Sequence, residues 1–215
     1  MNGKAGFTLV ELLIAMALSL VVFGIASQLM QSSSQFSQLS IANSSGIRDA
    51  QMAANVIADD VRRAVSIGNP GTLIDLGSAA TGAPGAIGNN LLVLTSSAVV
   101  GGRCTTPFEF TAYYFVLRSA LASADEWTRP VSDANNGSQR VLVQYSACAD
   151  KTDTTATLTN GQVRLTTDFL GQGSFTYAGL NSRRVTLNLQ AAKSIRGRTV
   201  SGAPIALTVF ARNIN

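Results

Sequence analysis

A single carboxylate near the N-terminus is the group in this sequence best placed to do chemistry. Glu11 lies within an apolar run that extends from Phe7 to Met30. An unpaired charge inside a membrane costs about 2.5 to 3.5 kcal/mol even on lenient insertion scales, so we expect Glu11 to have a cationic partner. A cut after Gly6 would create one, because it frees an α-amine on Phe7, one helical turn from Glu11. The pair can form within one chain or between two neighbouring helices.

The remaining residue types argue against catalysis. Histidine is absent, which excludes His-based triads, zinc sites with histidine ligands and most general-base schemes. Cys104 and Cys148 are the two cysteines, too few for a zinc site made only of thiolates. No Ser-x-x-Lys nucleophile motif occurs. We therefore predict that the protein is not an enzyme and that it has no cofactor and no metal site.

Two groups of acidic residues are candidate sites. Asp150 and Asp153, with Asp168 further along the chain, carry carboxylates of the kind that calcium binds. A lysine lies between the first two and the EF-hand spacing is absent, so a solvated loop is the favoured interpretation. Asp125 and Glu126 are adjacent, and adjacent side chains of an extended chain point in opposite directions. We expect a turn there rather than a carboxylate pair for glycoside hydrolysis.

The apolar run predicts a membrane segment. A helix over Phe7–Met30 would be about 36 Å long, enough to span a bilayer. Lys4 precedes the run and favours a cytoplasmic N-terminus, which places the rest of the chain outside the cytoplasm. A cleaved secretory signal peptide with a cut near Gly24-Ile25-Ala26 is the alternative. Such a segment would have no use for Glu11.

This topology bears on the two cysteines. Thiols are oxidised outside the cytoplasm, so we favour a structural disulfide between Cys104 and Cys148. The bridge would close a loop of about 45 residues and contribute roughly 4 kcal/mol in the chain-entropy estimate. Two unpaired buried cysteines are the alternative.

The first residues of the apolar run resemble a known processing motif. Gly6-Phe7-Thr8-Leu9-Val10-Glu11-Leu12-Leu13 is similar to the cleavage and methylation motif of type IV prepilins and type II secretion pseudopilins. The resemblance implies a membrane peptidase that cuts between Gly6 and Phe7, N-methylation of Phe7, and a role for Glu11 in subunit docking. Residues 1–6 would then be the leader, and residues 7–30 a transmembrane and filament-core helix.

An amphipathic helical stem is predicted over residues 31–67. Its apolar positions recur at spacings of three and four: Ile47, Ala50, Ala54, Ile57, Val61 and Val65. The charged residues expected to face outward are Arg48, Asp49, Asp59, Asp60 and Arg62. Asn43-Ser44-Ser45-Gly46 and, more weakly, Gly24 are candidate kinks. Gly68-Asn69-Pro70-Gly71 is expected to follow the helix as its stop signal.

Short strand-like runs predict a β-rich head over residues 68–215. They are Leu91–Leu94, Phe108–Leu117, Arg140–Tyr145, Gln162–Thr167, Val185–Gln190 and Ile205–Ala211. Apolar and polar residues alternate in Val185–Gln190, which indicates a sheet with one solvated face. Gly68–Asn90 is expected to be a surface loop, and Tyr113-Tyr114-Phe115 strand core and edge. The predicted fold class is α+β, a long N-terminal helix packed on an antiparallel head, as in pilins.

The positive charge is dispersed along the sequence. The net charge is +4, and the adjacent basic residues are the pairs Arg62-Arg63 and Arg183-Arg184, far apart along the chain. Basic residues at the start of a strand are typical of exposed sheet edges. We favour this interpretation of Arg183-Arg184 over a contact with DNA or with a filament neighbour.

Two further segments narrow the resemblance. They resemble PilW-type minor pilins most and J-type pseudopilins next. The first segment is Ala58–Val65, and the second is Arg183–Leu189 followed by Ile205–Asn213. The resemblance implies a minor pilin that takes part in priming and assembly of a type IV pilus. The alternatives are a J-type pseudopilin of type II secretion and, in a different class, a membrane-tethered module that binds a surface or DNA.

The same resemblance implies partners and a location. The partners would be other major and minor pilins, the prepilin peptidase and methylase, the inner-membrane assembly platform, and membrane lipid before assembly. DNA remains a candidate partner that the sequence does not support. The expected location is a single pass through the cytoplasmic (inner) membrane with the head outside the cytoplasm, followed by the pilus filament.

Overall fold

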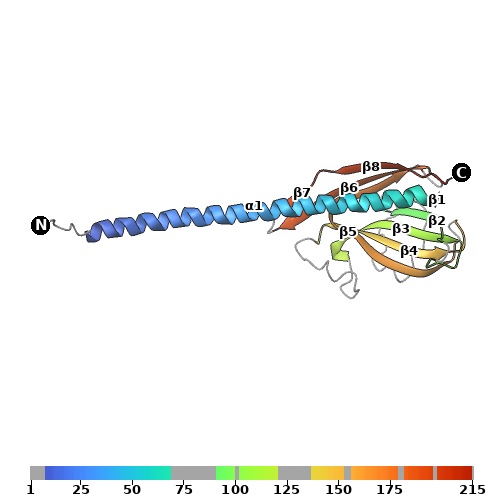
Figure 1. Cartoon of the computed structure of the whole chain (residues 1–215), viewed down its shortest axis with the longest axis horizontal. Coiled ribbons are helices and arrows are strands. Elements are labelled where there is room, and N and C mark those ends of the chain that lie inside the picture. Colours follow the sequence, from blue (N-terminus) through green and yellow to red (C-terminus); the bar gives the residue numbers. More distant parts are fainter. Residues whose placement is uncertain are drawn as a thin grey trace. The chain divides into compact units, whose positions relative to one another are not determined.

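The computed structural model describes residues 8–68, 91–99, 102–120, 137–152, 156–178, 182–195 and 198–214. Its elements are one long helix followed by an antiparallel sheet, which confirms the predicted α+β class (Figure 1). The chain divides into two compact units, Met1–Ile41 and Ala42–Asn215. The proposed cut at Gly6-Phe7, the loop after Gly68, the Asp125-Glu126 pair and Asp153 lie outside the described residues.

The helix α1 spans Leu9–Arg63 and runs without interruption through both predicted kinks, Gly24 and Asn43–Gly46. Gly46 has a packing reason instead: a Cβ placed on it would lie 3.1 Å from the Cβ of Ala191. The absent side chain therefore allows the helix to approach the sheet closely at this position.

The predicted helical stem, residues 31–67, extends beyond the end of α1 at Arg63. Residues 64–67 were expected to be helical, but Ala64–Ile67 form strand β1, which pairs with β2. Strand pairing gives the backbone groups of these residues partners that the last turn of a helix would lack.

The head is an antiparallel sheet in the order β1-β2-β3-β4-β5-β6-β7, with β8 also paired to β6. The bounds are β1 Ala64–Ile67, β2 Leu91–Ser97, β3 Phe108–Leu117, β4 Arg140–Ala149, β5 Leu158–Tyr177, β6 Arg184–Ile195, β7 Arg198–Ser201 and β8 Ile205–Phe210, with a 3-10 turn at Arg118–Ala120. All six predicted strands are present. The strands β1 and β7 were not predicted.

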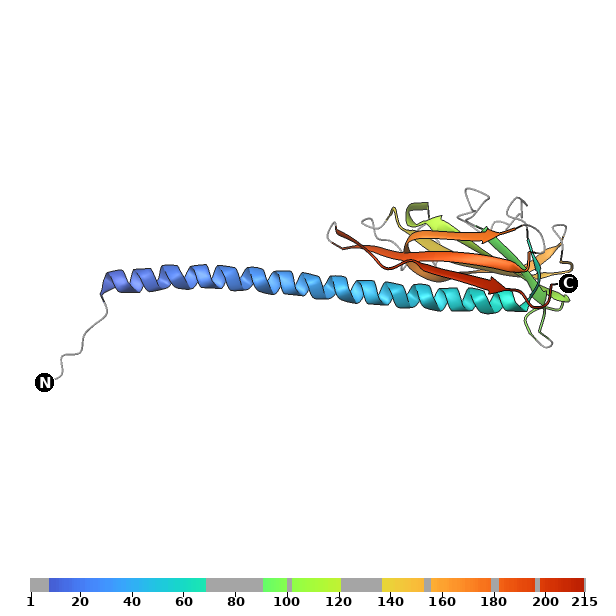
Figure 2. The same cartoon turned by 90° about the horizontal axis from the view of Figure 1, so that it is seen from above.

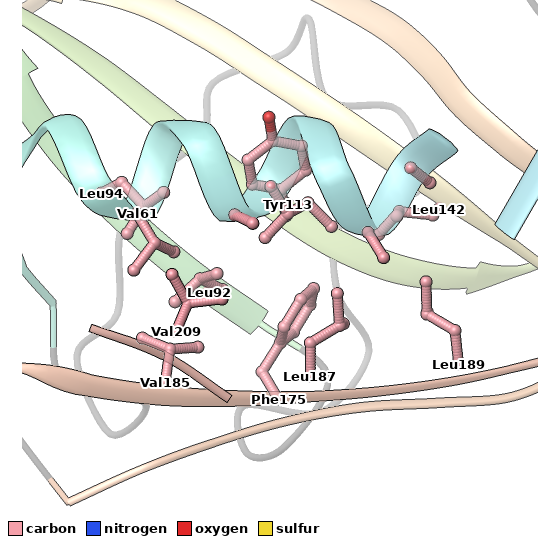
Figure 3. Close-up of a cluster of buried hydrophobic side chains, with 14 of the residues drawn as sticks. Val61, Leu92, Leu94, Tyr113, Leu142, Phe175, Val185, Leu187, Leu189 and Val209 are labelled. Atoms are coloured by element: carbon pink, nitrogen blue, oxygen red, sulfur yellow. The ribbon is translucent and has the colours of Figure 1, made fainter. Parts of the chain in front are cut away.

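The outer part of α1 supplies one side of the main core. Its buried residues are Ala50, Ala53, Ala54, Ile57, Ala58 and Val61. Figure 3 shows side chains of β2, β3 and β4 meeting those of β5, β6 and β8 around this helix segment, and together they form one buried cluster. Figure 2 shows β8 running alongside the last turns of α1. The sheet therefore curls around the helix, and the small alanine side chains let the two approach closely.

The expectation of one solvated face holds for part of the sheet only. In β6, Val185, Leu187 and Leu189 are buried and Asn188 is exposed, as predicted. In β2, β3 and β4 both faces are buried, and the face away from α1 has a second core cluster that includes Leu91, Tyr114 and Val143. The expectation is wrong for these three strands because their apolar residues are continuous rather than alternating.

The predicted disulfide is present. Cys104 is bonded to Cys148 of β4, with 5.3 Å between the two Cα atoms. Cys148 is buried, so the bridge ties the segment before β3 to the core of the head.

Two aspartates predicted to face solvent are instead partly buried. The Asp60 carboxylate pairs with Arg63 and accepts a hydrogen bond of 2.5 Å from the Tyr113 hydroxyl. Burial, together with the charge of Asp60, raises the pKa of Tyr113 above its ordinary value. Asp168 pairs with the buried Arg118, whose guanidinium lies 4.1 Å from the centre of the Phe169 ring. Both carboxylates therefore hold the head together: Asp60 does not face solvent from the helix, and Asp168 does not line a solvated loop.

Candidate assembly site

Glu11 lies in the first turn of α1. Of the predicted site residues that the structure describes, it is the one that lies outside the head. Its Oε2 accepts hydrogen bonds from the Thr8 backbone N–H and from the Thr8 hydroxyl, each 2.9 Å long. The Glu11 backbone N–H donates in return to Thr8 Oγ1 over 3.3 Å. Thr8 and Glu11 thus form a reciprocal capping box, which satisfies backbone donors that the start of a helix leaves unpaired.

Sequence reasoning missed Thr8 as the partner of Glu11. The signal was available, because Thr-x-x-Glu before an apolar run is the sequence pattern of a capping box. A carboxylate in the first turn is also favoured by the positive end of the helix dipole. Glu11 therefore has a local role in starting the helix, in addition to any role between subunits.

The Thr8 contacts orient the Glu11 carboxylate but leave its charge unmatched. Both Thr8 groups are neutral, and in the part of the chain that the structure describes no cation contacts Glu11. The first turn therefore presents an oriented anion that a cation can still neutralise.

The surface beyond Glu11 is apolar on all sides of the helix. Phe23 is 76% exposed and Met30 is 77% exposed. The other exposed large hydrophobic residues of this segment are Leu9, Val10, Leu12, Leu13, Ile14, Met16, Leu18, Leu20, Val21, Val22, Ile25 and Leu29. A helix that is hydrophobic all round needs a covering of lipid or of other helices.

This segment is long and apolar enough to cross a membrane. The most apolar part of α1 has a mean hydropathy of 2.6, and none of it is buried within the chain. Length and hydropathy agree with the predicted membrane segment over residues 7–30.

The other predicted site residues do not lie in the described first turn of α1. Gly6 and Phe7 lie outside the described residues, so cleavage and methylation there stay predictions. Cys104 and Cys148 are in the head, where they form the disulfide, and they are not part of the Glu11 site. Among the described residues there is no cluster of three or more histidine, cysteine or acidic residues that could hold a metal ion.

A comparison with protein families identifies the N-terminal segment. Residues 1–27 match the prokaryotic N-terminal methylation motif. The match covers residues 1–6, the Thr8–Glu11 capping box and most of the exposed apolar surface, and it supports a type IV pilin or pseudopilin. No curated protein and no solved structure matches the chain.

Proposed function

We propose that this chain is a minor pilin that is cleaved after Gly6, methylated on Phe7 and built into a type IV filament during its priming and assembly. The observation that carries the proposal is a helix with an exposed apolar surface whose first turn holds one oriented carboxylate. The family motif over residues 1–27 supports the broader class, a type IV pilin or pseudopilin.

The mechanism follows from what the exposed surface needs. Before assembly, lipid covers the apolar residues from Leu9 to Met30, and the head lies outside the cytoplasm. In the filament, neighbouring helices replace the lipid as the covering. Because lipid is as apolar as these side chains, that exchange gains little from the hydrophobic effect, and packing and polar contacts must favour it.

The Glu11 carboxylate and the Phe7 amine supply such a polar contact. Glu11 is held in place by Thr8 and retains an unmatched charge. A methylated amine keeps its positive charge while gaining apolar bulk, so the Phe7 terminus of a neighbouring subunit can neutralise Glu11 within an apolar bundle. Uncleaved protein lacks this amine at Phe7, which makes processing a condition for assembly.

Substitution of Glu11 separates its two roles. Glu11→Gln keeps the capping box, since glutamine suits that position as well as glutamate does, but removes the charge. We expect both Glu11→Gln and Glu11→Ala to reduce the amount of this protein in sheared filaments at least about tenfold, equivalent to about 1.4 kcal/mol. Thr8→Val is the matched control, because it loses both hydrogen bonds of the Thr8 hydroxyl and keeps the Thr8 N–H bond to the Glu11 carboxylate.

The readout is an immunoblot of the filament fraction against the membrane fraction. Equal membrane levels of all variants show that insertion is unchanged. Normal incorporation of Glu11→Gln, with loss in Glu11→Ala, would mean that the carboxylate serves only as a helix cap, and the proposed charge pairing would be wrong.

A J-type pseudopilin of type II secretion is the alternative, because the motif over residues 1–27 fits it equally. Crosslinking of the head in intact cells, with partners identified by mass spectrometry, distinguishes the two. Pilus subunits as the main partners support our proposal, whereas secretion pseudopilins would replace it with the alternative.

A further inference from the structure

On β5, β6 and β8 the sheet face away from α1 carries neutral polar side chains. Val185, Leu187 and Leu189 of β6 lie in the main core, so the residues between them lie on the opposite face. The second half of β5 and β8 follow the same alternation, because Phe175 and Val209 also belong to that core. We call the neutral polar residues of this surface the polar face. They are Gln172, Ser174, Thr176, Thr186, Asn188, Gln190 and Thr208.

Strand register aligns the polar face in rows. The rows are Gln172–Gln190, Ser174–Asn188 and Thr176–Thr186–Thr208. The Asn188 amide donates to Ser174 Oγ over 3.5 Å, and the hydroxyls of Thr186 and Thr208 lie 3.1 Å apart. These contacts between strands show that the side chains share one surface of the sheet.

A groove of about 390 Å³ opens at one end of the polar face. Gln172, Ser174, Asn188 and Gln190 line it, and Arg140 is the one charged residue among its described lining residues. The volume lies within the range of about 300 to 1,000 Å³ that is typical of small-molecule sites. Such sites are mostly apolar, whereas amides and a hydroxyl line this one. The groove therefore suits a ligand that has many hydrogen-bonding groups.

An exposed aromatic ring lies at the other end of the polar face. Phe210, the last residue of β8, is 61% exposed and lies opposite Arg184 of β6 in register. Arg184 and Gln190 are six positions apart on β6, which separates the ring from the groove by about 20 Å. The sequence led us to expect a sheet edge at Arg183-Arg184, but this is wrong, because β6 is paired with β5 on one side and with β8 on the other.

We propose that the polar face binds a linear, neutral oligosaccharide. Sugar hydroxyls donate and accept hydrogen bonds, as do the amides and hydroxyls of this face. One side of a pyranose ring presents C–H groups, which pack on the negative face of an aromatic ring such as Phe210. A distance of about 20 Å fits several sugar rings in a row, so one linear chain reaches both the groove and the ring.

Other classes of partner match the polar face less well. A nucleic acid needs a row of cations along its phosphates, whereas Arg140 and Arg184 border opposite ends of this face. The centre of a protein interface is rich in aromatic and apolar side chains. Among the described residues of this surface, Phe210 is the one large exposed hydrophobic residue.

A ligand-observed NMR titration of the full chain tests the proposal. The detergent is a polyoxyethylene ether, because an alkyl glycoside would itself present a sugar. The probes are cellohexaose, maltohexaose and xylohexaose, their disaccharides, and an oligothymidine as a charged chain. We expect at least one hexasaccharide to bind, at least about tenfold more tightly than its own disaccharide, because only the longer chain reaches both the groove and the ring.

Paired variants test whether the groove amides contact the sugar. Gln172→Ala with Asn188→Ala removes two amides from the groove and should weaken hexasaccharide binding at least about fivefold through lost hydrogen bonds. The matched control is Gln51→Ala with Gln162→Ala, which removes two exposed amides elsewhere. We expect the control to weaken binding less than about twofold, with both heads intact by circular dichroism.

Phe210→Leu tests the ring, because it keeps apolar bulk at an exposed position. It should weaken hexasaccharide binding at least about threefold. The proposal would be overturned if no hexasaccharide bound, if the two double variants lost binding equally, if Phe210→Leu bound as the parent chain does, or if the oligothymidine bound more tightly. Binding is measured on unassembled protein, so the result does not depend on the proposed function.

Discussion

At the scale of single residues, Glu11 combines a structural and an electrostatic task. Its contacts with Thr8 start the helix, and its charge remains available to a neighbour. The sequence alone pointed to the charge, since a carboxylate in an apolar run is costly. The sequence did not distinguish a glutamate that pairs with a cation from a glutamate that caps the helix, because the same residue type serves both roles. Glu11→Gln tests the two tasks one at a time.

Buried tyrosines make the head sensitive to alkali. Burial raises the pKa of Tyr114 to about 12, and its hydroxyl has no hydrogen-bond partner among the described residues. A tyrosine whose pKa is higher in the folded state stabilises the head fully below its unfolded pKa of about 10. This stabilisation is lost as the pH rises from about 10 toward the folded value, at about 1.4 kcal/mol per pH unit for each such tyrosine.

Between about pH 10 and about pH 12 the free energy of unfolding should therefore fall less steeply in Tyr114→Phe than in the parent chain. The difference should be about 1.4 kcal/mol per pH unit. At neutral pH it should unfold no more easily than the parent chain, because it removes an unpaired buried hydroxyl. Urea unfolding at a series of pH values measures both effects. An unchanged alkaline slope would show that the Tyr114 hydroxyl ionises as freely in the folded head as in the unfolded chain.

At the scale of elements, the outer part of α1 is bound to the sheet through one face. Ile57 is 1% exposed in the main core, whereas its neighbour Val56 is 37% exposed. Ile57→Ala should lower the free energy of unfolding of the head by about 2 to 5 kcal/mol, through lost burial and a cavity. Val56→Ala on the exposed face should cost less than about 0.5 kcal/mol. Urea unfolding followed by circular dichroism checks this, and equal losses would contradict the packing shown in Figure 3.

The disulfide is the second device that stabilises the head. Cys104 and Cys148 are separated by 44 positions in the sequence, so reduction should lower the free energy of unfolding by about 4 kcal/mol in the chain-entropy estimate. The double variant Cys104→Ser, Cys148→Ser should show a similar loss without reductant. Identical urea midpoints of oxidised and reduced protein would show that the bridge does not constrain the unfolded chain.

Periodicity predicted the long elements and failed for the short ones. The spacing of Ala50, Ala54, Ile57 and Val61 predicted the buried face of α1, because a helix repeats every 3.6 residues. The strands β1 and β7 have four residues each, too few to show alternation. They depend on pairing with β2 and β6, and such non-local pairing leaves no signal in a single sequence.

Three of the arginines show the same limit. Arg62, Arg184 and Arg212 belong to three segments whose proximity depends on strand pairing and on the end of α1. Their spacing in the sequence therefore predicted separate surface charges. By contrast, the Gly6-to-Leu13 motif could be recognised from sequence because its residues are consecutive.

At the scale of the whole molecule, the two units have different requirements. Residues 42–215 have their own core and disulfide, whereas none of the described residues covers the apolar helical surface of residues 9–30. The first unit therefore needs lipid or partner helices, whereas the second has a core of its own. The match of residues 1–27 to the methylation motif is consistent with this division.

We propose that processing at Gly6-Phe7 creates the cation that allows this helix to enter a filament. Mass spectrometry of the N-terminal peptide, taken from protein in sheared filaments, tests it most directly. We predict that the peptide begins at N-methylated Phe7. A filament-bound protein that still carries residues 1–6, or one that begins near Ser27, would contradict this role of processing.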